Sequence, residues 1–110
     1  MSKDKLPSVV EQFAEDRPDV WNAYNQLAQA TLEAGPLDEK TARLIKLGIA
    51  IGAARRGAVR AHARRGAGVG LTRQELEHVA LLGITTVGWP AAFASLCWIQ
   101  EALEDAKPDQ

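Results

Sequence analysis

The sequence lacks a second cysteine, because Cys97 is the only one among 110 residues. A single thiol excludes a disulfide within the chain. Lone, unpaired cysteines are typical of reducing compartments, so we expect a cytoplasmic protein. Cys97 lies in an apolar stretch and belongs to no CxxC motif, which favours an unreactive thiol in the core.

Long apolar runs are also missing. No run approaches 18 residues without a charge, so we expect no transmembrane helix and no membrane partner. The first residues, MSKDKLPSVVEQF, contain no apolar segment like that of a secretory signal. The overall balance of apolar and charged residues is that of a soluble globular protein. At this length we expect one domain over residues 1–110.

Acidic residues are absent from the middle of the chain. Residues 40–73 contain nine Lys or Arg and no acid, whereas 1–39 contain eight acids and three bases, and 74–110 contain six acids and one base. The flanks therefore neutralise the middle, and the net charge is −1. Nucleic-acid-binding domains usually carry a basic excess as a whole, so we expect no nucleic-acid partner. We expect instead that acidic helices pack beside the basic segment, within a subunit or between subunits.

A clean alternation of apolar and polar residues is missing too, so we expect no strand and an all-α fold of four to six helices. The helical spacing of apolar residues predicts helices at about 8–16, 18–34, 39–54, 58–66, 73–87 and 90–105. Pro18 and Pro90 suit the first turns of their helices. Thr72 and Glu75 have the spacing of a capping box, which predicts a helix start at about residue 73.

Several residues predict how these helices pack. The helix at 39–54 is apolar nearly all round, so we expect it to be central and buried. Gly48 and Gly52 lie four residues apart on it and indicate close backbone packing. Gly57 predicts a break or kink before the arginine-rich helix. We interpret the three tryptophans mainly as core residues, with Trp89 and Trp98 as candidates to line a cavity.

His62 is the sharpest single candidate for chemistry. An imidazole titrates near neutral pH, so a histidine in a pocket can relay protons. The alternative is a histidine at the surface or satisfied within a basic helix. Ala58 and Gly66 are among its helical neighbours, and such small residues leave space either for tight packing or for a ligand.

Five arginines surround His62 within residues 55–65. Arg56, Arg60 and Arg64 follow one another at four-residue steps and form a stripe of like charge. Such a stripe needs acids or an anionic ligand nearby, and we favour ion pairs with the acidic terminal helices. Arg55 would share the side of His62 if the helix is continuous, which makes it a candidate for binding a substrate carboxylate.

Two further motifs are weak. Glu75 and His78 have the spacing of a carboxylate–histidine metal pair, but no partner pair exists, so we interpret them as a solvated helix face and expect no metal site. The glycines of GAGVG do not follow a predicted strand, which leaves a dinucleotide-binding loop unsupported. We therefore expect no cofactor.

Residues 37–96 as a set resemble the carboxymuconolactone decarboxylase family, which also contains the alkylhydroperoxidase-like proteins. The shared markers are the LDEKT helix start, the apolar helix, a histidine on the next helix, the GLTRQEL capping turn and the GWPAA turn. The resemblance implies an alkylhydroperoxidase-like helical subunit that assembles into trimers or hexamers, with sites near subunit contacts. Residues 37–96 would be the family core, preceded by N-terminal helices in residues 1–36.

The peroxidase branch of this family carries a CxxCxxxH motif, with a glutamate twelve residues before the first cysteine. Placing His62 on the motif histidine puts the two cysteine positions at Arg55 and Ala58 and the glutamate position at Arg43. Peroxide reduction in that branch requires one thiol to attack and another to resolve the product. We therefore expect no CxxC-type peroxidase activity.

The decarboxylase branch does not depend on the cysteine pair and acts on a small lactone that bears carboxylates. The resemblance then makes His62 the candidate catalytic residue, and Arg55 and Arg43 the candidate substrate-binding residues. The first function we consider is a small anionic-ligand site with lyase-type acid–base chemistry. The alternatives are a non-catalytic binding or assembly protein and, less favoured, an antioxidant hydroperoxidase.

Overall fold

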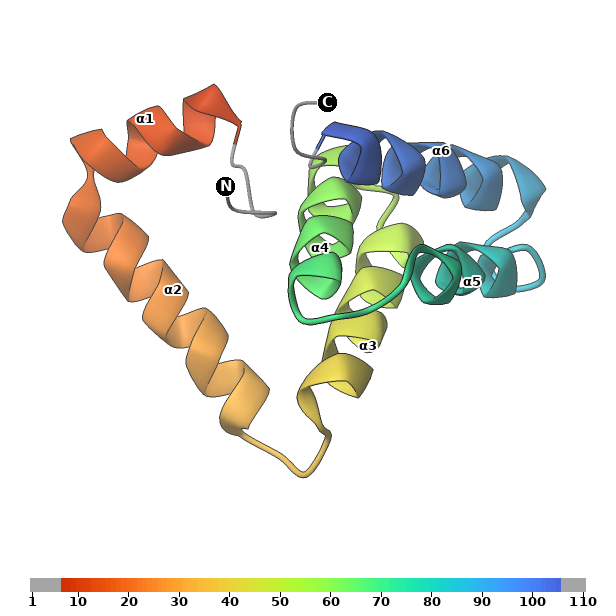
Figure 1. The fold of residues 1–110 in the computed structure, drawn as a ribbon, viewed down its shortest axis with the longest axis horizontal. Helices are drawn as coiled ribbons and strands as arrows, with labels where there is room; N and C mark the ends of the chain where they lie inside the picture. Colours follow the sequence, from red (N-terminus) through yellow and green to blue (C-terminus); the bar gives the residue numbers. More distant parts are fainter. Residues whose placement is uncertain (1–6, 106–110) are drawn as a thin grey trace. The chain divides into compact units, whose positions relative to one another are not determined.

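The computed structural model describes residues 7–105, and this part of the chain forms six α-helices and no strand (Figure 1). The predicted all-α fold is therefore confirmed. The helices, in chain order, are α1 (Ser8–Asp16), α2 (Pro18–Glu33), α3 (Glu39–Gly52), α4 (Arg56–Gly68), α5 (Arg73–Gly83) and α6 (Trp89–Asp105).

The chain divides into two compact units, one made by α1 and α2 and the other by α3 to α6. In the first unit Pro18 occupies the start of α2, where its missing N–H costs no helical hydrogen bond. The ring of Trp21 lies 6.4 Å from that of Phe13 and 6.1 Å from that of Tyr24, measured between centroids. Neither helix has a fully buried residue, because two short amphipathic helices cannot enclose a core by themselves.

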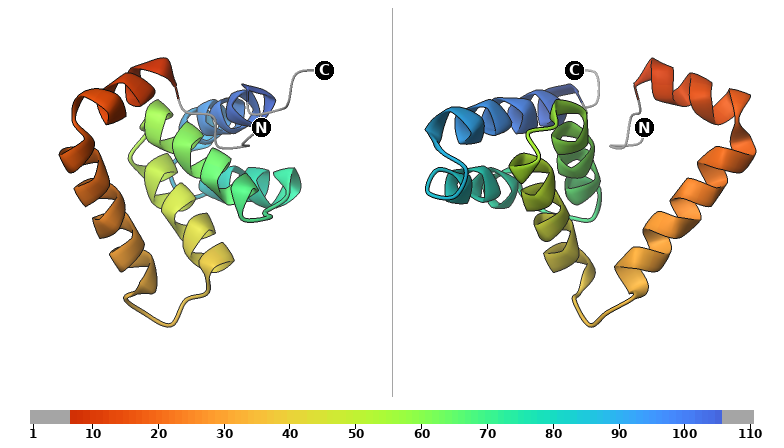
Figure 2. Two further views of the ribbon diagram at one scale, coloured as in Figure 1. Left: turned by 60° about the vertical axis from the view of Figure 1, so that its left-hand side comes forward. Right: turned by 180° about the vertical axis from the view of Figure 1, so that it is seen from behind.

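The second unit has a continuous apolar core to which all four helices contribute. Helix α6 packs against α4 and α5, and α3 packs against the same two helices (Figure 2). The buried core residues are Leu47, Ala50, Ile51, Val59, Ala63, Leu71, Leu76, Ala80, Ile99 and Ala102. Many of them are alanines, so the helices approach one another closely.

The break between α3 and α4 lies at residues 53–55, and the predicted break at Gly57 is wrong. The N–H of Arg55 donates to the carbonyl of Ala50, and the N–H of Ala54 donates to the carbonyl of Ile51. These two bonds form a Schellman motif, with Ala54 in the left-handed region at φ 55°. Since that motif ends α3, Gly57 lies within the first turn of α4.

The turn between α4 and α5 was predicted well. Leu71 donates to the carbonyl of Gly66 and Gly70 to that of Ala67, with Gly70 at φ 97°. The second Schellman motif thus places a glycine where positive φ is required. Thr72 and Glu75 then form the predicted capping box, and α5 begins at Arg73.

Helix α3 is less buried than its composition predicts. Only Leu47, Ala50 and Ile51 are buried on it, whereas Ile49 is 67% exposed. A helix in a four-helix unit can bury only the face that its neighbours cover, so its apolar outer face remains exposed in this chain. The expectation of a central helix buried all round is therefore wrong.

Close backbone packing at Gly48 and Gly52 is not observed either. A Cβ at Gly48 would make ordinary contact with Val79 at 3.6 Å, and one at Gly52 would meet nothing within 4 Å. The tightly packed glycine is Gly66, where a Cβ would lie 2.9 Å from the side chain of Leu76. Gly66 faces the core from α4, so its missing side chain makes room for that leucine.

The three tryptophans and Cys97 are less buried than predicted. Trp89 is 59% exposed, and Trp21 and Trp98 are only half-buried, as is Cys97 on α6. Short helices with alanine at many contacts leave no enclosed space large enough for an indole. Over residues 7–105, no helix has the length and apolarity that a membrane span requires.

Candidate functional site

His62 lies on α4, half-buried on the side that α3 covers. Its Nδ1 atom is fully buried, and no described residue provides it with a hydrogen-bond partner. Burial first, and then the positive charges of Arg65, Lys46 and Arg43 in that order, together lower the pKa of His62 to about 4. The ring is therefore neutral at pH 7 in the empty site.

Three cationic side chains from two helices surround this imidazole. Arg43 and Lys46 lie three residues apart on α3, and Arg65 lies three residues after His62 on α4. Because residues at that spacing share a helix face and the two helices pack together, the two pairs lie face to face. We call Arg43, Lys46, His62 and Arg65 the basic cluster.

Two members of the basic cluster show that its positive charges lack compensation. The pKa of Lys46 is lowered by burial and by the charges of Arg43 and Arg65. The Nε–H of Arg43 is buried and has no hydrogen-bond acceptor within the described part of the chain. A buried donor on a charged group without an acceptor costs about 1–3 kcal/mol or more, so this arrangement favours an anion that supplies the missing acceptor.

No carboxylate of residues 7–105 forms an ion pair with Arg43, Lys46 or Arg65. Several acids of α5 and α6 bind other residues. On α6, Glu101 accepts hydrogen bonds from Arg56 at 2.8 Å and Arg60 at 2.9 Å. Asp105 also binds Arg60, and on α5 Glu77 binds Arg73 while Glu75 caps the helix.

These ion pairs explain most of the arginine stripe. Arg56 and Arg60 join α4 to α6, which confirms for these two residues the predicted pairing with the C-terminal acidic helix. Arg64 continues the stripe inward and is only 7% exposed. The stripe therefore lies on the α6 side of α4, apart from the basic cluster.

The two arginines predicted as ligand residues occupy different places. Arg43 belongs to the basic cluster, whereas Arg55 is exposed at the N-cap of α4 and is not among the charges that act on His62. Seven residues of helix separate Arg55 from His62, which corresponds to about 10 Å along the axis. The structure brings His62 and Arg43 together and leaves Arg55 at the end of the helix.

Sequence reasoning missed Lys46 and Arg65 as site residues. Each lies three residues from a predicted one, Lys46 from Arg43 and Arg65 from His62. This spacing is visible in the sequence, and it would have placed each residue beside its neighbour. That the two pairs face each other depends on how α3 packs on α4, which the sequence does not display.

The weaker motifs form no site. The Glu75 carboxylate accepts the N–H of Thr72, a hydrogen bond that lowers its pKa, and His78 is exposed. Among residues 7–105, no group of three or more His, Cys, Asp or Glu residues is arranged to hold a metal ion. Arg55 and Ala58 stand at the cysteine positions of the peroxidase motif, and Cys97 is on a different helix.

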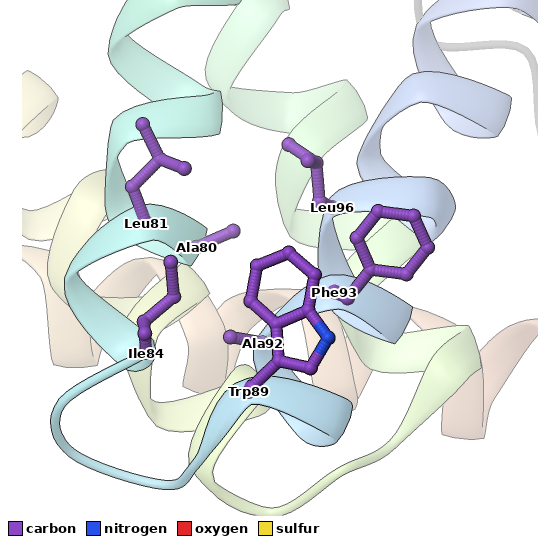
Figure 3. A pocket seen from close by; sticks show the side chains of 7 residues that line it. All are labelled: Ala80, Leu81, Ile84, Trp89, Ala92, Phe93 and Leu96. Atoms are coloured by element: carbon purple, nitrogen blue, oxygen red, sulfur yellow. The ribbon is translucent and has the colours of Figure 1, made fainter.

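Two apolar hollows lie outside the basic cluster. An open groove of about 230 Å³ runs between α3 and α5, and Thr86 is the single polar residue among those that line it: Gly48, Ile51, Gly52, Val79, Leu82, Gly83, Thr86 and Val87. Figure 3 shows the smaller hollow, where side chains of α5 and α6 meet around the indole of Trp89. Its volume of about 10 Å³ is too small for an organic ligand. The Trp89 ring instead stacks on Phe93, with centroids 5.3 Å apart.

Comparisons with known proteins agree with this fold. The crystal structure of an apo carboxymuconolactone decarboxylase family protein from Legionella pneumophila is similar, with a TM-score of 0.70 and 24% sequence identity. The match covers 92% of this chain and 89% of that one, and at this identity it shows the fold alone. No curated protein matches the chain. The family model for the carboxymuconolactone decarboxylase family matches residues 18–101, well over half of the sequence. The chain therefore belongs to the carboxymuconolactone decarboxylase family.

Proposed function

We propose that this protein binds a small anionic molecule, a small carboxylate in particular, at the basic cluster around His62. The observation that carries the proposal is an uncompensated charge: three cationic side chains surround a half-buried imidazole, and none of them pairs with a described carboxylate. Keeping unpaired like charges partly buried costs free energy. An anionic ligand supplies the opposite charge and reduces this cost, which contributes to its free energy of binding.

The hydrogen-bonding groups of the site also suit a carboxylate. The Nε–H of Arg43 needs an acceptor, and the oxygens of a carboxylate are acceptors only. A guanidinium binds carboxylates strongly because charge and hydrogen bonds act together. Arg55, exposed at the start of α4, is a second candidate donor for a ligand that extends along that helix.

Lyase-type chemistry is the reaction class that we attach to this site. In a decarboxylation the bond between the carboxylate carbon and its neighbour breaks, carbon dioxide leaves, and the electron pair stays on the neighbouring carbon. The cations stabilise the negative charge that develops there. His62 is the group that would deliver a proton to this carbon.

A thermal-shift screen of small carboxylates tests the proposal. We expect carboxylates to raise the Tm of the wild type, and to raise it much less in Arg43→Gln and His62→Gln, because ligand binding stabilises the folded state in proportion to occupancy. Arg73→Gln is the matched control, since it removes a cation that pairs with Glu77 on α5. Equal shifts in all four proteins, or none in the wild type, would contradict the proposal.

A second candidate function is self-association without catalysis. Exposed apolar residues of α3 and α5 support it: Ile49 is 67% exposed and Leu82 is 59% exposed, and Leu82 lines the groove between these helices. Interfaces between copies of a chain are apolar and poor in charge at their centre. We propose that a second copy covers this face, in a trimer or hexamer.

A further inference from the structure

We propose that Lys46 and Arg65 bind the anion together with Arg43, and that His62 takes up a proton from solution when a dianion binds. This inference rests on the proposed anion site and adds to it the ligand residues and the protonation state of the complex. It makes His62 an acid in the complex, although its ring is neutral in the empty site.

The placement of the cations supports the first part. Arg43, Lys46 and Arg65 all lower the pKa of His62, and Arg43 and Arg65 also lower the pKa of Lys46, so all three cations lie in one electrostatic environment. With three positive charges and no paired carboxylate among the described residues, a monoanion leaves two charges uncompensated and a dianion leaves one. The site therefore favours dianions.

The orphaned Nδ1 atom of His62 supports the second part. In a neutral imidazole one nitrogen carries a hydrogen and the other is an acceptor. The groups that surround this ring, Arg43, Lys46 and Arg65, are donors only and carry positive charge, so they oppose its protonation. A bound dianion offsets two of the three positive charges and accepts a hydrogen bond from the ring, and both effects favour the imidazolium.

The other helices supply no competing charge. On α6, Glu101 and Asp105 bind the arginine stripe on another side of α4, and on α5, Glu77 binds Arg73. None of these acids, nor Glu75 or Glu104, is among the charges that shift the pKa of His62. The proton balance of the site therefore depends on Arg43, Lys46, Arg65 and the ligand.

Sulfate is the appropriate probe, because it stays a dianion across the range from pH 5 to pH 7.5 and any proton taken up belongs to the protein. We expect calorimetry of sulfate binding in two buffers of different ionisation enthalpy to show net proton uptake below pH 6.5. Between the pKa of the empty site, about 4, and the higher pKa of the complex, each unit fall in pH should strengthen binding by up to tenfold.

Variants separate the two parts of the inference. In His62→Gln, sulfate should still bind, with no proton uptake and no dependence on pH. In Lys46→Gln and Arg65→Gln, binding should weaken at least tenfold, whereas Arg73→Gln should bind as the wild type does. The chain has two histidines, so the His78 resonance is an internal control in an NMR experiment at fixed pH, and it should not shift when sulfate is added.

The outcomes distinguish this inference from the proposed function. Sulfate binding without proton uptake in the wild type, or proton uptake that persists in His62→Gln, would overturn the inference and leave the anion site standing. Full affinity in Lys46→Gln and Arg65→Gln would overturn the assignment of those residues. No binding of sulfate or of any small carboxylate would overturn both proposals.

Discussion

At the scale of single residues, His62 links the stability of the fold to pH. Its pKa is about 4 in the folded chain and about 6.5 in an unfolded one, so between these values the unfolded state binds a proton that the folded state does not. Stability gained by keeping this ring neutral is thus fully present above pH 6.5 and is lost as the pH falls toward 4. We expect the free energy of unfolding, measured with urea, to decrease over that window.

The substitution His62→Gln should flatten this part of the pH profile, since glutamine does not titrate. His78 is exposed on α5, so His78→Gln should leave the profile unchanged. Sulfate offers a second check, because an anion in the basic cluster should raise the pKa of His62 and reduce the same slope. An unchanged slope in His62→Gln would show that another group causes the loss of stability.

At the scale of helices, the end of α3 contains a correctable strain. Ala54 closes a Schellman motif at φ 55°, a conformation in which a Cβ costs about 1–2 kcal/mol. Glycine adopts this conformation freely but loses more entropy on folding, so we expect Ala54→Gly to stabilise the fold by about 0.5–1 kcal/mol. Urea unfolding of the two proteins measures the difference.

At the end of α4 the reverse substitution, glycine to alanine, can be made. Gly70 closes the equivalent motif at φ 97°, and Gly70→Ala should destabilise the fold by about 1–2 kcal/mol. The expected reversal of sign between these two substitutions follows from the backbone alone. If both substitutions change stability in the same direction, positive φ is not what sets their effect.

The packing of α4 on α6 depends on an ion-pair network. Arg60 is 20% exposed and donates to both Glu101 and Asp105, so it holds two turns of α6. We expect Arg60→Gln to destabilise the fold by about 1 kcal/mol, near the upper end for such pairs. The exposed pair of Arg73 and Glu77 on a single helix is the control, and Arg73→Gln should cost about 0.3–0.5 kcal/mol. A double-mutant cycle of Arg60→Gln with Glu101→Gln isolates the coupling, and a coupling of zero would contradict this role.

At the scale of the whole molecule, the exposed apolar face of α3 and α5 predicts self-association. Light scattering after gel filtration should give the mass of a trimer or hexamer for the wild type. Ile49→Glu places a charge where an apolar contact is expected, so the variant should elute at a lower mass. Glu104→Gln, a substitution at an exposed position of α6, should not change the mass. A monomeric wild type would rule out this face as an interface between copies.

Much of the helical framework could be predicted from the sequence. Proline at residues 18 and 90, the capping box of Thr72 and Glu75, and the glycine at residue 70 are local signals, because each acts through the backbone of its own segment. Two misplaced helix ends show the limit: the first break is not at Gly57, and α5 ends at Gly83 rather than near residue 87. Ala54 ends α3 through hydrogen bonds to Ala50 and Ile51 in a conformation for which alanine carries no signal.

The sequence by itself determined the all-α class and most helix starts, and it made His62 and Arg43, which lie together in the basic cluster, candidate site residues. Only the tertiary structure decided that Lys46 and Arg65 join them, that Arg55 lies apart, and that Arg56 and Arg60 are neutralised by α6. The reason is physical. Spacing along one helix fixes which side chains share a face, but the charge that a face meets depends on which other helix packs against it.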